Sequence, residues 1–109
     1  MGRESLGEFE QLVLLAILRL GSEAYGVPIV REIEDRTGRE SSRAAVYIAL
    51  KRLQAKGLVS SRMADPTPER GGRAKRYFKI EQAGVDLVRE SRRALVSMWE
   101  DLEPILEDV

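Results

Sequence analysis

The stretch SSRAAVYIALKRLQAKG, residues 41–57, predicts an amphipathic helix from which the rest of the fold can be worked out. Ser41 and Ser42 are candidates for its N-cap, because a serine hydroxyl accepts a hydrogen bond from a free N–H of the first turn, and Gly57 ends it. Three apolar residues spaced by four and three share one face: Val46, Leu50 and Leu53. The other side is polar and mostly basic: Arg43, Tyr47, Lys51, Arg52 and Gln54.

Two helices are expected upstream of this stretch. Over residues 7–20, apolar side chains recur at steps of three and four. Three leucines widen that apolar side, so this helix should be buried on most of its sides: Leu14, Leu15 and Leu18. A second helix is expected from Gly26 to Gly38, with Pro28 in its first turn, where the missing N–H costs nothing.

Downstream of the quoted stretch, the hydrophobic pattern changes from a helical one to that of strands. Residues 58–63 and 75–80 form two short β-capable runs. Residues 64–74 between them contain two prolines and two glycines, which predicts a long, non-helical hairpin loop. This loop is also rich in arginine.

Residues 82–108 predict one long helix with an apolar seam. Its members alternate three and four apart: Val88, Ser91, Leu95, Met98, Leu102, Ile105 and Val109. Pro104 lies inside the pattern and should kink or weaken the helix near residues 100–103. A seam this apolar is not expected to remain exposed to water on a chain of this size. We therefore expect a stable dimer. The expected interface residues are Val88, Leu95, Met98, Trp99, Leu102 and Ile105.

The net charge of zero hides an asymmetry along the 109 residues. Residues 1–40 carry five basic and eight acidic side chains, and residues 81–109 carry three and eight. Residues 41–80, in contrast, carry ten basic and two acidic side chains, a net charge of +8. A compact basic face is typical of a protein that binds a polyanion. The alternative is a solvated basic surface that balances acidic ends.

The composition excludes several kinds of site. The chain contains no cysteine and no histidine. Disulfides, Cys/His metal sites, thiol nucleophiles and Ser–His pairs are therefore excluded. We expect no catalytic residue, no metal and no cofactor, and hence no enzyme. No uninterrupted apolar stretch approaches the 18 residues of a membrane span, so we expect no membrane partner and a cytoplasmic location.

The order of the expected elements predicts the fold. Three short helices followed by a β-hairpin with a basic loop is the order of a winged helix-turn-helix, in which the third helix is the recognition helix. The fold class should be mainly α with a small β-hairpin. We expect a winged helix-turn-helix DNA-binding domain over residues 1–80 and a long C-terminal dimerisation helix over residues 81–109.

Nearly the whole chain resembles the PadR-like transcriptional regulators. The motifs that carry this resemblance are GEFE at 7–10, AYGVPI at 24–29, YIALKRL at 47–53, KGLV at 56–59, RYFKI at 76–80 and QAG at 82–84. Ile48 stands where the family commonly has proline, and Arg43-Ala44-Ala45 stands where Pro-Gly-Thr is frequent. These two differences lie in the DNA-facing turn, so the family's base preferences are not carried over. Glu81 replaces a common threonine at the start of the last helix.

The resemblance implies a homodimer that binds an inverted-repeat operator in double-stranded DNA and usually represses. It implies dimerisation through the long C-terminal helix packed with the partner's N-terminal helix. The chain looks like the short subclass without an added effector domain. In some short members, a cavity at the dimer interface, lined by a tryptophan of the last helix, binds flat aromatic ligands. Trp99 is the matching residue here, and a small aromatic effector is a possible partner; the other interpretation is ordinary interface core.

DNA contacts are expected from the recognition helix and the hairpin. The candidates are Ser41, Ser42, Arg43, Tyr47, Lys51, Arg70, Arg73, Lys75 and Arg76. Arg43 is the best candidate for a base contact, because arginine pairs bidentately with guanine. The hairpin residues are expected to bind phosphates, since a loop positions a side chain too loosely to read bases. Tyr47 contacts a phosphate or only covers the helix surface, and Tyr25 is expected to pack at the turn into the second helix.

One alternative of another class remains. A winged helix can serve as a protein-interaction module that does not read DNA. Retention on heparin and binding to random duplex DNA would separate these two functions, because an interaction module would show neither.

Overall fold

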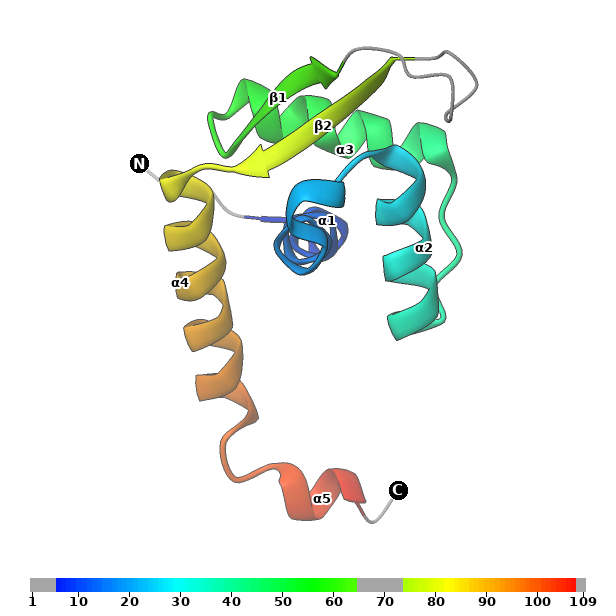
Figure 1. Ribbon diagram of the computed structural model, residues 1–109. Helices are drawn as coiled ribbons and strands as arrows, with labels where there is room; N and C mark the ends of the chain where they lie inside the picture. The colour runs from blue at the N-terminus through cyan, green and yellow to red at the C-terminus, as the bar shows by residue number, and fades with distance from the viewer. Residues whose placement is uncertain (1–5, 65–73, 108–109) are drawn as a thin grey trace.

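The computed structural model describes residues 6–64 and 74–107. Three helices pack together beside a two-stranded sheet, and a fourth helix extends away from them (Figure 1). The elements are α1 (Glu8–Leu20), the 3-10 turn η1 (Gly21–Glu23), α2 (Gly26–Thr37), α3 (Arg43–Ala55), β1 (Val59–Ala64), β2 (Lys75–Ile80), α4 (Gln82–Trp99) and α5 (Glu103–Glu107). This is the predicted winged helix-turn-helix order, and the first three helices end within one or two residues of the predicted positions.

The core lies between the first three helices and the inner face of the hairpin. Its fully buried larger side chains are Val13, Leu14, Ile29, Val46, Leu50 and Leu53. The buried side predicted for residues 41–57 is therefore confirmed. The prediction for α1 is wrong on one side: Leu15 and Leu18 are 42% and 48% exposed. They face outward because α2, α3 and β2 contact the other sides of this helix.

The hairpin is antiparallel, with Val59 opposite Ile80 and Ala64 opposite Lys75. The first strand begins one residue later than predicted, because Leu58 is buried in the turn that follows α3. The Phe78 N–H donates to the Ala24 carbonyl over 2.8 Å. This bond fixes the segment before α2 along the edge of β2. Most of the predicted loop between the strands lies outside the described residues.

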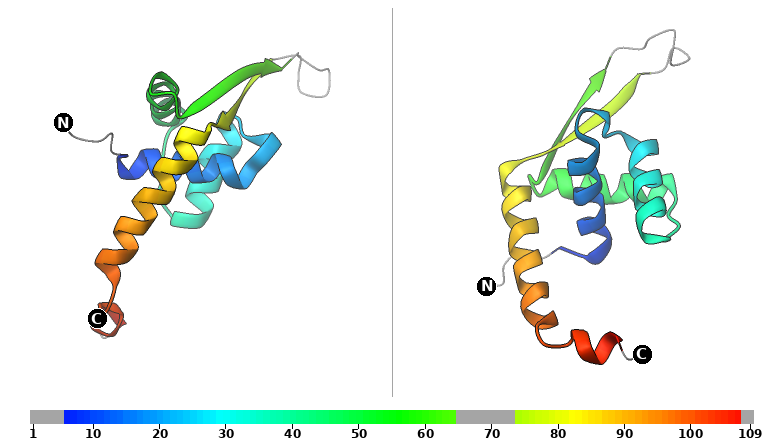
Figure 2. Two further views of the ribbon diagram at one scale, coloured as in Figure 1. Left: turned by 90° about the vertical axis from the view of Figure 1, so that its left-hand side faces the viewer. Right: turned by 60° about the horizontal axis from the view of Figure 1, so that its bottom comes forward.

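The start of α4 is held tightly against the turn between α3 and β1. The Glu81 N–H donates to the Leu58 carbonyl over 2.8 Å. A Cβ atom added at Gly84 would lie 2.5 Å from that same carbonyl oxygen and 2.8 Å from Ile80 Cγ1. Only glycine therefore fits at this crossing. Beyond it, α4 leaves the domain and extends away (Figure 2).

The prediction of one continuous helix over 82–108 is wrong. α4 ends at Trp99, Asp101 has a left-handed φ of 66°, and α5 follows from Glu103. The reason is Pro104, which lacks the N–H that would bond to the Glu100 carbonyl and whose ring would clash with that carbonyl. The weakening predicted near residues 100–103 is thus a full break. Leu102 and Ile105 do not continue the line of Leu95 and Met98.

Candidate nucleic-acid interface

The two serines before α3 take different positions. The Ser42 hydroxyl accepts a hydrogen bond from the Ala45 N–H over 3.0 Å, so Ser42 is the N-cap. The Ser41 hydroxyl oxygen is buried, yet within residues 6–64 and 74–107 it has no hydrogen-bond partner. Contact between this hydroxyl and a ligand would need a rotation of its side chain.

The side of α3 that faces away from the core is open. Its exposed residues are Arg43, Ala44, Tyr47, Ile48, Lys51, Arg52, Gln54 and Ala55. The Tyr47 ring lies close to the first turn of α2, since a Cβ atom added at Gly26 would lie 3.7 Å from its ring carbon Cε2. The ring remains 43% exposed. Helix α3 thus presents an arginine, a tyrosine and a lysine, as predicted from their spacing.

An aromatic pair joins the hairpin to the turn before α2. The rings of Tyr25 and Tyr77 lie 5.2 Å apart and are tilted by 59°. The Lys75 ammonium lies 5.3 Å from the Tyr25 ring centre, and the Arg62 guanidinium carbon lies 5.2 Å from that of Tyr77. Cations at this distance are attracted to ring faces. The packing role predicted for Tyr25 is therefore confirmed, and Lys75 is positioned by it.

Arg76 is linked to the recognition helix through two hydrogen bonds. Its Nη1 donates to the Ser61 hydroxyl over 3.0 Å, and that hydroxyl donates to Gln54 Oε1 over 3.1 Å. The sequence analysis missed Ser61 and Gln54 as residues that position Arg76. The register Ser61↔Phe78 places Ser61 and Arg76 on one face of the hairpin. Because register depends on the turn, the sequence pattern could not show it.

In the described residues of α3 and the hairpin, every charged side chain is basic. Residues 41–64 and 74–80 contain eight basic side chains and no acidic one. Lys56 turns toward α1, where its Nζ lies 3.5 Å from Glu10 Oε1. The other cations lie on α3 and on the hairpin, where the register places Arg62, Lys75 and Lys79 on the face opposite to that of Arg76. They are Arg43, Lys51, Arg52, Arg62, Lys75, Arg76 and Lys79. Two predicted contact residues, Arg70 and Arg73, lie outside the described part of the chain.

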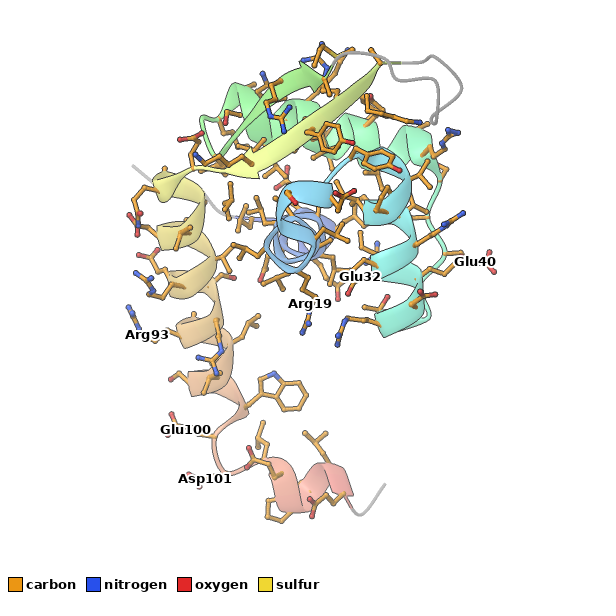
Figure 3. All side chains as sticks on the ribbon, in the orientation of Figure 1. Arg19, Glu32, Glu40, Arg93, Glu100 and Asp101 are labelled. Atoms are coloured by element: carbon orange, nitrogen blue, oxygen red, sulfur yellow. The ribbon has the colours of Figure 1, made fainter. Side chains whose placement is uncertain are left out.

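Large apolar side chains are also exposed on α1, α4 and α5. We call these side chains together the apolar face: Leu15, Leu18, Leu95, Val96, Met98, Trp99, Leu102, Ile105 and Leu106. Met98 is 75% exposed and Trp99 is 52% exposed. Val88, also predicted for the dimer interface, is partly buried against this chain's own core. In Figure 3, Arg93 on α4 and the residues Glu100 and Asp101 just after it lie on the side that is turned away from α1.

Other kinds of site find no support in the described residues. Within them, no group of three or more acidic side chains is arranged to hold a metal ion. None of the helices described here combines the length and apolar character needed to cross a membrane.

Comparison with known proteins agrees with this geometry. The model of the transcriptional regulator PadR-like family matches residues 14–90, from the middle of α1 to the middle of α4. The chain belongs to the PadR-like family of transcriptional regulators. This family is one of transcriptional regulators, so the chain is assigned to that class and not to the enzymes. None of the curated proteins matches the sequence.

Solved structures of the family share the fold. A PadR family transcription regulator from Clostridium difficile superimposes with a TM-score of 0.75 at 19% identity, over 92% of this chain and 99% of that one. A PadR-like regulator from Bacillus cereus gives 0.72 at 17% identity, over 90% of each chain. One from Eggerthella lenta gives 0.69 at 24% identity, over 92% and 87%. At these identities the likeness supports the fold, including the extended α4.

Proposed function

We propose that this regulator is a homodimeric, sequence-specific DNA-binding repressor that works in the cytoplasm. One observation carries the proposal: within the described residues, α3 and the two strands of the hairpin, the elements that a winged helix offers to DNA, hold seven basic side chains and no acidic one. The acidic side chains lie mainly in the first forty residues and in the last helices. Such a separation favours one orientation on a polyanion.

In this proposal α3 enters the major groove and the hairpin follows the phosphates. Arg43, at the exposed start of α3, reads a base, while Tyr47 and Lys51 bind the backbone. Lys75 and Arg76 bind phosphates from positions fixed by Tyr25 and Ser61. Ser41, Ser42 and the loop residues Arg70 and Arg73 complete the proposed contact set, with Ser42 acting through the N–H groups of the helix that it caps.

Dimerisation through the apolar face is supported by its exposure. The C-terminal half of α4 extends beyond the domain (Figure 2), and three of its residues are exposed apolar side chains: Leu95, Met98 and Trp99. Leu102 and Ile105 add apolar area beyond the break. A twofold axis through this face would place two recognition helices about 34 Å apart, one turn of DNA. The operator would then be an inverted repeat. The proposal also includes a planar aromatic effector between two copies of Trp99.

The experiment is selection of binding sites from a random duplex library with the purified chain. Enrichment of an inverted repeat whose half-sites are about 10 base pairs apart supports the proposal. Binding to random DNA and to heparin, measured alongside, should weaken steeply with salt. A chain that ignores heparin, random duplexes and the library would instead be an interaction module. Reporter expression from the selected site then separates repression from activation.

A further inference from the structure

One apolar side chain stands at the centre of the polar side of α3. Directly opposite the buried residues are four positions spaced by four, three and four, all exposed: Ala44, Ile48, Lys51 and Ala55. Ile48 is 54% exposed and is the largest apolar side chain of this set. Its neighbours on either side are cations, Lys51 and Arg52.

Neither packing nor dimerisation accounts for this isoleucine. It is outside the core, and it is separate from the apolar face, which lies on α1, α4 and α5. Ile48 lines a shallow groove that runs toward the start of α1 and includes Phe9 and Ala45. That groove is bordered by two ion pairs, Arg39 with Glu8 at 3.2 Å and Lys56 with Glu10 at 3.5 Å. The isoleucine is thus an exposed apolar group between this groove and the cations Lys51 and Arg52 of α3.

We propose that Ile48 reads a thymine in the major groove through the methyl group on C5. This inference rests on the proposed function, since it places α3 in that groove. Among the four bases, only thymine offers an apolar group at the major-groove edge. An isoleucine has no hydrogen-bonding atom, so opposite a cytosine it would leave the exposed amino group without a partner. Ala44, one turn earlier and small, lets the helix approach the base edges closely.

The test uses duplexes in which single thymines of the selected site are replaced by deoxyuridine, which removes only the methyl group. For the unmodified chain, one replacement in a single half-site should weaken binding about fourfold, the factor for about 0.8 kcal/mol per buried CH₂ group, and the same replacement in both half-sites about fifteenfold. In Ile48→Ala this replacement should have no effect, and in Ile48→Val most of the effect should remain. Because Ile48 is exposed, both variants should fold, which circular dichroism checks.

Lys51→Gln is the matched control on the same side of α3. It should weaken binding to thymine and deoxyuridine duplexes by the same factor, because a phosphate contact does not sense the methyl group. If every deoxyuridine penalty persists in Ile48→Ala, or if none exists for a chain that binds its site tightly, the thymine contact is wrong and DNA binding stands. A chain that selects no site overturns both.

Discussion

Ser41 and Ser42 are neighbours, yet their hydroxyls should contribute differently to stability. Ser42 satisfies the free N–H of Ala45, whereas the buried Ser41 hydroxyl has no partner among the described residues. Ser42→Ala should therefore lower the free energy of unfolding by about 1 kcal/mol. Ser41→Ala should leave it unchanged or raise it slightly, because no hydrogen bond is lost. Urea denaturation of both variants checks this, and equal losses would contradict the assigned cap.

Gly84 should tolerate no side chain at all. The added methyl group of Gly84→Ala would meet the Leu58 carbonyl oxygen, which already accepts the Glu81 N–H. Relief of this clash must move α4 away from the hairpin, so we expect a loss of about 1–3 kcal/mol in unfolding free energy. Ala83→Gly, at the exposed neighbouring position, is the control and should cost no more than about 1 kcal/mol. A fully stable Gly84→Ala would show that α4 is less closely packed than described.

The recognition helix and the hairpin should contribute differently to DNA binding. Lys75→Gln removes a phosphate contact from each hairpin of a dimer, so affinity for operator and random DNA should fall alike. The slope of log affinity against log salt should decrease by about two. Arg43→Ala should instead relax discrimination at one or two operator positions by about 1–3 kcal/mol each. Titrations on operator, mutated operator and random duplexes check both. If both variants lose the same affinity on all three duplexes, the recognition helix and the hairpin do not have these separate roles.

The elements could be predicted from local sequence, but the contacts between them could not. Periodicity places α1, α2 and α3, and serine and glycine chemistry places their ends. The pairing of Tyr25 with Tyr77 joins residues 52 positions apart, and nothing in local sequence encodes such a distant ring contact. The end of α4 could be predicted only in part. Pro104 predicted a kink or a weakened helix there. The seam pattern cannot distinguish a kink from a break, because the spacing of the apolar residues along the sequence is the same in both cases.

At the level of the whole molecule, the apolar face should hold two copies together. Leu95→Glu places a charge within it and should convert the dimer to a monomer, because burying an unpaired carboxylate is costly. Light scattering at micromolar concentration gives the mass directly. The control is Arg93→Glu on the same helix, whose side chain is turned away from α1 (Figure 3) and should leave the mass unchanged. An unmodified chain that is monomeric would contradict the assembly.

The last prediction joins the dimer to a ligand. If two copies of Trp99 meet across the interface, a planar aromatic compound stacked between them should quench the fluorescence of the only tryptophan. Flavins, phenolic acids and cationic dyes are suitable probes. Trp99→Leu should abolish their binding, measured by calorimetry, and so should the monomeric Leu95→Glu. A bound compound can release DNA only through different affinities for the two dimer states.

That requirement makes the ligand prediction quantitative. The coupling free energy between compound binding and operator binding should be about 1–3 kcal/mol, and it should be the same whichever of the two ligands is titrated. The compound should weaken operator binding by some factor between about 5 and 150, and saturating operator DNA should weaken binding of the compound by that same factor. Calorimetric titrations of the compound with and without the operator measure the second value, and operator titrations measure the first. Compound binding that is unaffected by operator DNA, or that survives in Trp99→Leu, would make Trp99 ordinary interface core and would place any regulation elsewhere.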